Sequence, residues 1–336
     1  MPLKSIPVID IAPFKHGNGT ARKNVADKVA QACVDIGFLI VSGHGVPSHI
    51  IQRMAAVSKA FFALDPSEKK KVSRPRPEVI RGYGAMESEG LAYSQDEETP
   101  PDLKEVFDAG PLDVPDTEYY RGVAAGVHFA DNLWPDTPRD FREVYTDYFR
   151  RMETLALDMA HIFATALDLS ADFFDEKLDR HISILRANYY PRLTRPPRAK
   201  QLRGGEHSDY TAFTILWQER IPSAGLEARA PGGAWIDVPA IDGTMVINIG
   251  DSLMRWTNDK WISTQHRVVN PPHESARDHD RLSLVYFVQP NYDASIKCIE
   301  TCQSAEAPAK YPAVLNGDYL YSKFSKQSKM KLGASR

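Results

Sequence analysis

The sequence predicts a mostly β protein with flanking helices, in which a β-sandwich or jelly roll follows a mixed α/β N-terminal region. Two observations carry this prediction. From about residue 182 the chain consists of short β-rich runs, and turn sequences such as Pro231-Gly232-Gly233 and Asp242-Gly243 separate several of them. Upstream of these runs, apolar residues recur at helical spacing between a few strand-like segments.

The N-terminal region, residues 1–130, alternates short strands with helices. Its strands are brief aliphatic runs, and its helices carry apolar residues at helical spacing. Gly37 ends the first of these helices, and Asp65-Pro66 marks the end of the second. The elements expected in order are a strand at 6–11, a helix at 22–36, a strand at 38–41, a helix at 50–64 and short extended pieces at 81–83 and 104–107.

A long scaffold helix is expected within residues 131–180. Pro138 suits the first helical position, and Thr137 and Asp140 have capping-box-like spacing. The apolar residues that follow form one stripe, which indicates core packing rather than a cofactor site. The stripe comprises Phe141, Tyr145, Tyr148, Met152, Leu155, Met159, Ile162 and Ala166.

Residues 181–292 are expected to form the β-rich core, and residues 293–336 a tail with one more helical turn at 319–321. The core strands are short and lie at the spacing typical of sandwiches and jelly rolls. They are expected at 182–190, 213–217, 245–249, 265–269 and 282–288.

The composition is that of an ordinary folded protein. Apolar residues make up 43% and charged residues 25% of the chain, which argues against a disordered, fibrous or membrane-embedded protein. The formal net charge of −3 favours neither nucleic acid nor an acidic membrane as a partner. The N-terminus lacks the layout of a signal peptide, and Cys33, Cys298 and Cys302 fit neither a zinc ribbon nor a disulfide framework. We therefore expect a cytoplasmic protein with reduced thiols.

Two histidines and one aspartate are spaced as ligands of a metal ion. His207 and Asp209 stand two apart before a strand-like run, and in extended chain such residues point to the same side. His266 lies in a second strand-like run. Two histidines and one carboxylate leave open positions on an octahedral ion, an arrangement typical of non-haem Fe(II) oxygenases. A co-substrate and dioxygen can then bind the same ion.

An arginine and a serine two apart predict a carboxylate site. Arg281 and Ser283 share one face of the run at 282–288 and offer a guanidinium fork and a hydroxyl. Tyr190, at the end of Asn188-Tyr189-Tyr190-Pro191, supplies another hydroxyl. Alone, Arg281 fits an ordinary ion pair at a strand end. The order Tyr-Pro, His-x-Asp, distal His and Arg-x-Ser favours the functional interpretation.

These motifs, in this order, resemble the iron(II)/2-oxoglutarate-dependent dioxygenases, in particular the isopenicillin-N-synthase-like branch. The resemblance covers nearly the whole chain. In the N-terminal part it rests on Ile-Pro-Val-Ile-Asp, on the segment from Gly37-Phe38 to Val46-Pro47, on Arg81-Gly82-Tyr83 and on Asp102-Leu103-Lys104-Glu105. In the C-terminal part it rests on Asn188-Tyr189-Tyr190-Pro191, Gly205-Glu206-His207-Ser208-Asp209-Tyr210, Asn248-Ile249-Gly250-Asp251 and His266-Arg267-Val268.

The resemblance implies a fold, a reaction and a set of site residues. The implied fold is a distorted double-stranded β-helix, a jelly roll flanked by helices. The implied reaction uses O2, converts 2-oxoglutarate to succinate and CO2, and oxidises a C–H bond of a small molecule, by default through hydroxylation. A different substrate pose would give desaturation or ring closure. The implied roles are Fe(II) binding by His207, Asp209 and His266 and binding of the distal 2-oxoglutarate carboxylate by Arg281 and Ser283 with Tyr190 assisting.

Two other functions stay open at this point. The first is an Fe(II) oxidase that uses O2 without 2-oxoglutarate and takes all four electrons from its substrate, as the namesake of the branch does. The namesake retains the Arg-x-Ser motif, so this motif does not distinguish the two functions. A zinc hydrolase or a metal-binding regulatory protein is a weaker alternative, because a hydrolase prefers three ligands and one activated water and has no use for the Arg-x-Ser motif that accompanies the ligands here. The sequence does not identify the primary substrate.

Two further groups of residues lie near the motifs. Candidate substrate-pocket residues, each of which also fits ordinary packing, are Phe107, Phe213, Phe287 and Asn291. A basic stretch precedes the first metal-ligand candidate and comprises Arg192, Arg195, Arg198, Lys200 and Arg203. Charge runs are most often solvated loops, and attraction of an anionic substrate is the alternative.

Overall fold

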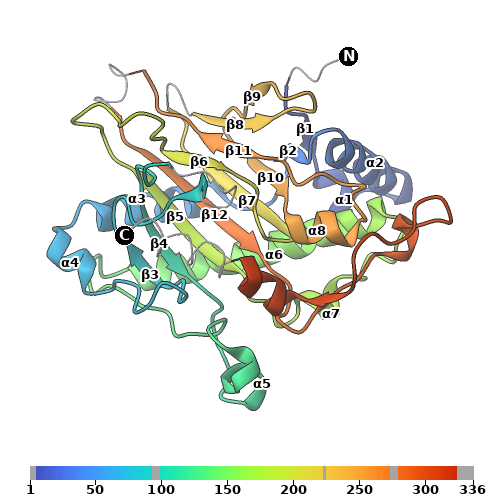
Figure 1. Cartoon of the computed structure of the whole chain (residues 1–336), viewed down its shortest axis with the longest axis horizontal. Coiled ribbons are helices and arrows are strands. Elements are labelled where there is room, and N and C mark those ends of the chain that lie inside the picture. The colour runs from blue at the N-terminus through green and yellow to red at the C-terminus, as the bar shows by residue number, and fades with distance from the viewer. Residues whose placement is uncertain (1–4, 93–98, 222–224, 273–278, 324–336) are drawn as a thin grey trace.

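The computed structural model describes residues 5–92, 99–221, 225–272 and 279–323 (Figure 1). Its helices are α1 (Ala12–His16), α2 (Gly19–Asp35), α3 (Ser48–Phe62), α4 (Pro66–Lys70), α5 (Glu118–Arg121), α6 (Phe141–Ala166), α7 (Asp175–Leu178) and α8 (Asp251–Trp256), and residues 316–323 are also helical. Its strands are β1 (Val8–Asp10), β2 (Phe38–Ser42), β3 (Gly82–Gly84), β4 (Glu105–Ala109), β5 (Ile184–Tyr190), β6 (Gly204–His207), β7 (Phe213–Gln218), β8 (Leu226–Arg229), β9 (Trp235–Asp237), β10 (Met245–Ile249), β11 (His266–Val268), β12 (Arg281–Val288), β13 (Ser295–Ile296) and β14 (Val314–Leu315).

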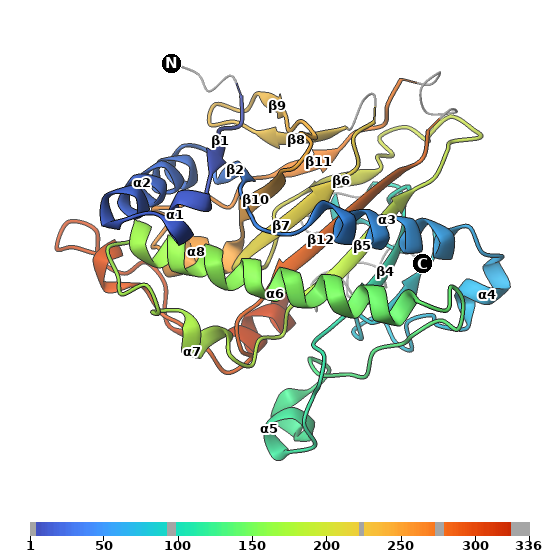
Figure 2. The same cartoon turned by 180° about the vertical axis from the view of Figure 1, so that it is seen from behind.

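Two β-sheets form the centre of the molecule. The larger has eight strands in the order β1-β2-β10-β7-β12-β5-β4-β3, and the smaller has four in the order β6-β11-β8-β9. Strands from the N-terminal part therefore extend both edges of the larger sheet. Helices cover its outer face, with α6 running across several strands (Figure 2). The predicted mostly β fold with flanking helices and a jelly-roll core is confirmed.

Alternation along β12 gives the larger sheet two different faces, because neighbouring side chains of a strand point to opposite sides. Leu282, Leu284 and Tyr286 are buried in the main hydrophobic cluster, which also holds the apolar stripe of α6. Arg281 and Ser283, on the opposite face, line a cavity between the sheets. One strand thus contributes both to the packing core and to the candidate site.

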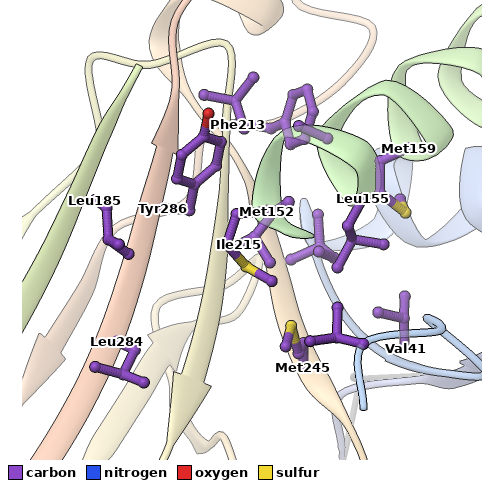
Figure 3. Close-up of a cluster of buried hydrophobic side chains, with 14 of the residues drawn as sticks. Val41, Met152, Leu155, Met159, Leu185, Phe213, Ile215, Met245, Leu284 and Tyr286 are labelled. Atoms are coloured by element: carbon purple, nitrogen blue, oxygen red, sulfur yellow. The ribbon is translucent and has the colours of Figure 1, made fainter. Parts of the chain in front are cut away.

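The packing face of the larger sheet is sealed by α6. Met152, Leu155 and Met159 of this helix lie against side chains from β2, β5, β7, β10 and β12 (Figure 3). These side chains are Val41, Leu185, Phe213, Ile215, Met245, Leu284 and Tyr286. The helices α2 and α3 pack in turn against α6. The predicted stripe of α6 is buried along its whole length, as expected for core packing.

A second hydrophobic cluster joins the two sheets. It combines Ile40, Leu216 and Val285 from the larger sheet with Leu226 and Val268 from the smaller. This contact fixes the distance between the sheets next to the cavity.

None of the helices in the described parts of the chain has the length and apolar character that crossing a membrane requires.

Local differences from the sequence predictions have clear causes. The helix expected to start near Pro138 begins at Phe141, because the chain first makes a turn in which the Phe141 amide donates to the Pro138 carbonyl. Asp140 precedes the helix but makes no capping hydrogen bond with its side chain. The strands β6, β8 and β9 were not predicted, because they have only three or four residues and β6 begins with two glycines.

The aromatic packing around Phe107 provides a test of the core. Phe107 is fully buried, and its ring lies 4.8–5.4 Å from those of Phe61, Phe141 and Tyr145. Phe107→Ala should lower the free energy of unfolding by about 3–5 kcal/mol, because it removes these contacts and leaves a cavity. Urea denaturation would measure the change. Val123→Ala is the control, since Val123 is 99% exposed and its truncation should change stability by less than about 0.5 kcal/mol. Equal stabilities of the two variants would contradict this description of the core.

Candidate metal centre and adjoining cavity

The candidate metal centre forms where β6 meets β11 in the smaller sheet. These strands are antiparallel, and their register places His207 directly opposite His266. Asp209 follows β6 by two residues, so its carboxylate returns to the same side as His207. The Asp209 Oδ1 atom lies 3.7 Å from His207 Nε2 and 3.8 Å from His266 Nε2. One ligand atom from each residue lies within 4.8 Å of the others, a spacing that could hold a metal ion.

Hydrogen bonds fix which atoms face the shared space. The Nδ1 atoms of His207 and His266 lie 2.8 Å from the Gly205 carbonyl and 3.1 Å from the Thr264 carbonyl. A carbonyl oxygen only accepts, so each Nδ1 carries the proton and each Nε2 presents a lone pair. Such partners orient imidazole ligands in metal sites.

The Asp209 carboxylate is oriented in the same manner. Its Oδ2 atom accepts hydrogen bonds from Thr214 Oγ1 at 2.6 Å and Asn248 Nδ2 at 2.8 Å. Thr214 lies on β7 and Asn248 on β10, and the two residues are paired across the larger sheet. The larger sheet thus holds one oxygen of Asp209 and leaves Oδ1 facing the two histidines.

Electrostatics favour the protonation states that metal ligands need. Burial, and then the neighbouring His266, lower the pKa of His207 to about 3, so its imidazole is neutral. Burial opposes ionisation of Asp209, but the adjacent imidazoles and the Asn248 and Thr214 hydrogen bonds bring its pKa below the usual value. A neutral imidazole beside an ionised carboxylate suits a divalent cation.

A buried guanidinium faces the same cavity from the larger sheet. Arg281 is 1% exposed and pairs across β12 and β5 with Tyr190, whose ring centroid lies 4.9 Å from the guanidinium carbon. Arg281 Nη2 donates to Gln218 Oε1 at 2.9 Å, whereas its Nε and Nη1 atoms have no hydrogen-bond partner among the residues that the structure describes. Ser283 and Asn188 form a further pair along these strands.

The unpartnered nitrogen atoms of Arg281 show whether the cavity suits an anionic co-substrate. Burying a guanidinium without a partner is costly, and a carboxylate matches its fork of donors. The Asn188 side-chain oxygen beside Ser283 also lacks a partner. The residues present therefore fit a dicarboxylate that reaches from Arg281 toward the three candidate metal ligands, all of which line one cavity.

The cavity has a volume of about 250 Å³ and lies between the two sheets. Away from Arg281 its wall includes Phe287, the buried Arg186 and the partly buried Glu89. Arg186 Nε donates to Asp108 at 2.7 Å, and its Nη1 and Nη2 donate to Glu89 at 3.0 and 3.2 Å. Burial opposes ionisation of Glu89, but the nearby cations Arg186, Arg74 and Lys104 hold its pKa well below the usual value. This end wall, called the ionic end wall below, therefore carries a fixed ion pair beside apolar side chains such as Phe287 and Ile184.

The other candidate pocket residues lie elsewhere. Phe107 packs among aromatic rings of the main core, and Phe213 lies 5.1 Å from Phe163 in the same cluster. Asn291 binds the loop after α7, donating to Glu176 O and Asp179 Oδ1. Their side chains serve packing and loop structure, whereas Phe287 lines the cavity.

Sequence reasoning missed the residues that surround the candidate ligands. Thr214 and Asn248 lie in strands that had been predicted, but neither had a motif that linked it to Asp209. The ionic end wall joins β5 with residues more than 75 positions away, such as Asp108 and Glu89, and only the tertiary fold brings these together. Arg203 is a buried member of the basic stretch, whereas Arg192, Arg195, Arg198 and Lys200 are exposed, as in a solvated loop.

Two family profiles match the chain. The profile described as non-haem dioxygenase in morphine synthesis N-terminal matches residues 6–137, and that of the 2OG-Fe(II) oxygenase superfamily matches residues 181–290. The second match contains every candidate metal and carboxylate residue.

Similar proteins and structures agree with these profiles. The 2-oxoglutarate-Fe(II) type oxidoreductase hxnY of Emericella nidulans is 32% identical, over 92% of this chain and 86% of that protein. Proline hydroxylase buaE of Petromyces alliaceus is 30% identical over 82% of this chain and 84% of its own length. The structure of a full-length Neurospora crassa protein in complex with alpha-KG and thymine has a TM-score of 0.82 and 29% identity, with 95% of this chain and 96% of that chain covered.

The Thr214 hydrogen bond to Asp209 gives a prediction for metal binding. Thr214→Val keeps the side-chain shape but removes the donor to Oδ2, so affinity for Mn(II) should fall about 10- to 100-fold. Metal titration by calorimetry would measure this. Thr154→Val on the exposed side of α6 is the matched control and should bind Mn(II) like the wild type. Unchanged affinity in Thr214→Val would show that this bond does not orient a ligand.

Proposed function

Because this chain belongs to the 2OG-Fe(II) oxygenase family, we propose that His207, Asp209 and His266 bind its Fe(II) and that its 2-oxoglutarate binds at Arg281. The protein is a 2-oxoglutarate/Fe(II)-dependent dioxygenase that uses O2 and acts on small molecules. Ser283 and Tyr190 complete the proposed carboxylate site. The observation that carries the assignment is the convergence of two Nε2 atoms and one carboxylate oxygen, each oriented by a hydrogen bond at the other polar atom of its side chain.

The chain's own residues bind and orient the reactants. His207 and His266 offer neutral nitrogens, and Asp209 offers one oxygen while Thr214 and Asn248 hold the other. Arg281 neutralises the distal carboxylate of 2-oxoglutarate. With both groups bound, the site gains the power to oxidise a C–H bond while 2-oxoglutarate is converted to succinate and CO2.

The ionic end wall supports a small polar primary substrate. Arg186 and Glu89 stay charged and face the cavity, so an apolar ligand there would cover polar groups without offering hydrogen bonds. Phe287, on the strand next to Arg186, offers an aromatic surface. The cavity of about 250 Å³ must also hold 2-oxoglutarate, which favours a substrate of few atoms. The thymine and 5-formyluracil bound by the Neurospora crassa protein are molecules of this size and polarity.

Hydroxylation of this substrate is the proposed outcome, since it is the default reaction of such sites. The formal net charge of −3 gives no support to nucleic acid as a partner. A cytoplasmic location stays a prediction of the sequence.

Binding of 2-oxoglutarate tests the proposed function. With Fe(II) and without oxygen, the wild type should bind 2-oxoglutarate and develop a weak visible absorption band. Arg281→Gln should weaken binding by about 2–5 kcal/mol, roughly 30- to 5,000-fold, because it removes the charge that pairs with the carboxylate. Calorimetry would measure both affinities.

Arg220→Gln is the matched control for that experiment. Arg220 is exposed and pairs only with exposed Asp242 among the described residues, so its loss should leave 2-oxoglutarate binding unchanged. Absence of binding in the wild type, or full binding by Arg281→Gln, would contradict the co-substrate assignment.

The polar end wall gives a prediction for substrate discovery. When a metabolite extract is partitioned between water and an apolar solvent, the aqueous fraction should stimulate succinate release, and the apolar fraction should not. Arg186→Met should lower this stimulation at least about 10-fold, because the wall loses the cation that holds the carboxylates of Glu89 and Asp108 in place. Succinate assays with each fraction would measure the effect. Stimulation confined to the apolar fraction would refute a polar substrate.

A further inference from the structure

One member of the basic stretch is buried beside the proposed 2-oxoglutarate site. Arg203 immediately precedes β6 and is 1% exposed, although Arg195, from the same stretch, has 83% of its side chain exposed. The guanidinium carbon of Arg203 lies 5.9 Å from the ring centroid of Tyr190. Arg281 approaches the same ring, with its guanidinium carbon 4.9 Å from the centroid. Tyr190 thus contacts two buried guanidinium groups.

Within the described parts of the chain, no carboxylate forms an ion pair with Arg203. Its Nε and Nη1 atoms have no hydrogen-bond partner there, and Nη2 makes only long contacts, 3.4 Å to Pro191 O and 3.5 Å to His279 O. The negative charge of Asp280 favours the protonated form of Arg203. That carboxylate, however, already accepts hydrogen bonds from the Tyr189 hydroxyl at 2.9 Å and from Lys59 Nζ at 3.4 Å.

Two buried like charges around one tyrosine oppose folding unless an anion joins them. Burial, and then the charge of Arg281, lower the pKa of Arg203 to about 10, which still leaves the guanidinium protonated at neutral pH. Arg281 shares the same feature, with Nε and Nη1 unpartnered. An anion held at Arg281 would relieve the repulsion between the two groups, since opposite charges at short range stabilise each other strongly in a buried site.

We propose that Arg203 is a second cation of the 2-oxoglutarate site, a positioning residue that holds Tyr190 against Arg281 and strengthens attraction of the distal carboxylate. The proposal rests on the function proposed above. Arg203 does not line the cavity, so it acts through Tyr190 and through its charge rather than by touching the reacting atoms. Exposed arginines of the stretch, in contrast, serve as ordinary loop residues.

This role predicts opposite effects on binding and on stability. In Arg203→Gln the affinity for 2-oxoglutarate should fall about 10-fold, as expected for loss of one charge acting over several ångströms in a protein. The melting temperature without ligand should stay level or rise, because the repulsion of Arg281 is gone. The KM for 2-oxoglutarate should rise while kcat stays near the wild-type value. A purely structural arginine would instead lower the melting temperature and leave the affinity unchanged.

The experiment is calorimetry with 2-oxoglutarate on the Mn(II)-loaded protein, with melting curves with and without 2-oxoglutarate. Arg203→Lys keeps the charge and should bind 2-oxoglutarate within about threefold of wild type. Arg195→Gln removes an exposed charge from the same stretch and is the matched control, with wild-type binding expected.

The outcomes separate this proposal from the proposed function. If the wild type does not bind 2-oxoglutarate, the proposed function fails. If the wild type binds and Arg203→Gln binds equally well, only the role of Arg203 is overturned. If Arg203→Gln does not fold, Arg203→Lys decides: near-wild-type affinity supports a charge effect, and a loss of about 10-fold or more overturns it.

Discussion

Alternation of side chains across the larger sheet places the packing core on one face and the cavity on the other. Every second residue of β12 must pack against α6, and the residues between them must face the cavity. The same rule places Thr214 of β7 and Asn248 of β10 on the cavity face, where both bind Asp209. The sheet that builds the core therefore also orients the carboxylate of the candidate metal centre, and a one-residue shift in register would disrupt both.

The buried polar groups of the cavity face lower the stability of the fold and favour the binding of ligands. Unpartnered donors of Arg281 and Arg203 and the unpartnered oxygen of Asn188 are buried, and each such group opposes folding. Apolar packing compensates, since the core beneath α6 and the second cluster between the sheets bury a large set of side chains. Ligands that satisfy the buried donors should therefore stabilise the fold as they bind.

The local parts of this arrangement could be predicted from sequence, and the long-range parts could not. His207 and Asp209 stand two apart, and Arg281 and Ser283 do likewise, so the strand period alone puts each pair on one face. The apolar stripe of α6 could be predicted because helical periodicity puts residues three and four apart on one face. The short, glycine-rich β6 carries little strand signal, although its register with β11 brings the two histidines together. The ion pairs of Arg186 with Asp108 and Glu89, and the burial of Arg203 within an otherwise solvated basic stretch, arise only in the folded chain.

The proposed metal site has two Nε2 atoms and Asp209 Oδ1 on one face, and its co-substrate reaches Arg281. A crystal structure of the protein with Fe(II) and 2-oxoglutarate, grown without oxygen, would show both contacts. We expect iron bound by His207, Asp209 and His266, with the distal carboxylate of 2-oxoglutarate on Arg281. Iron bound elsewhere, or a carboxylate that does not contact Arg281, would contradict this proposal.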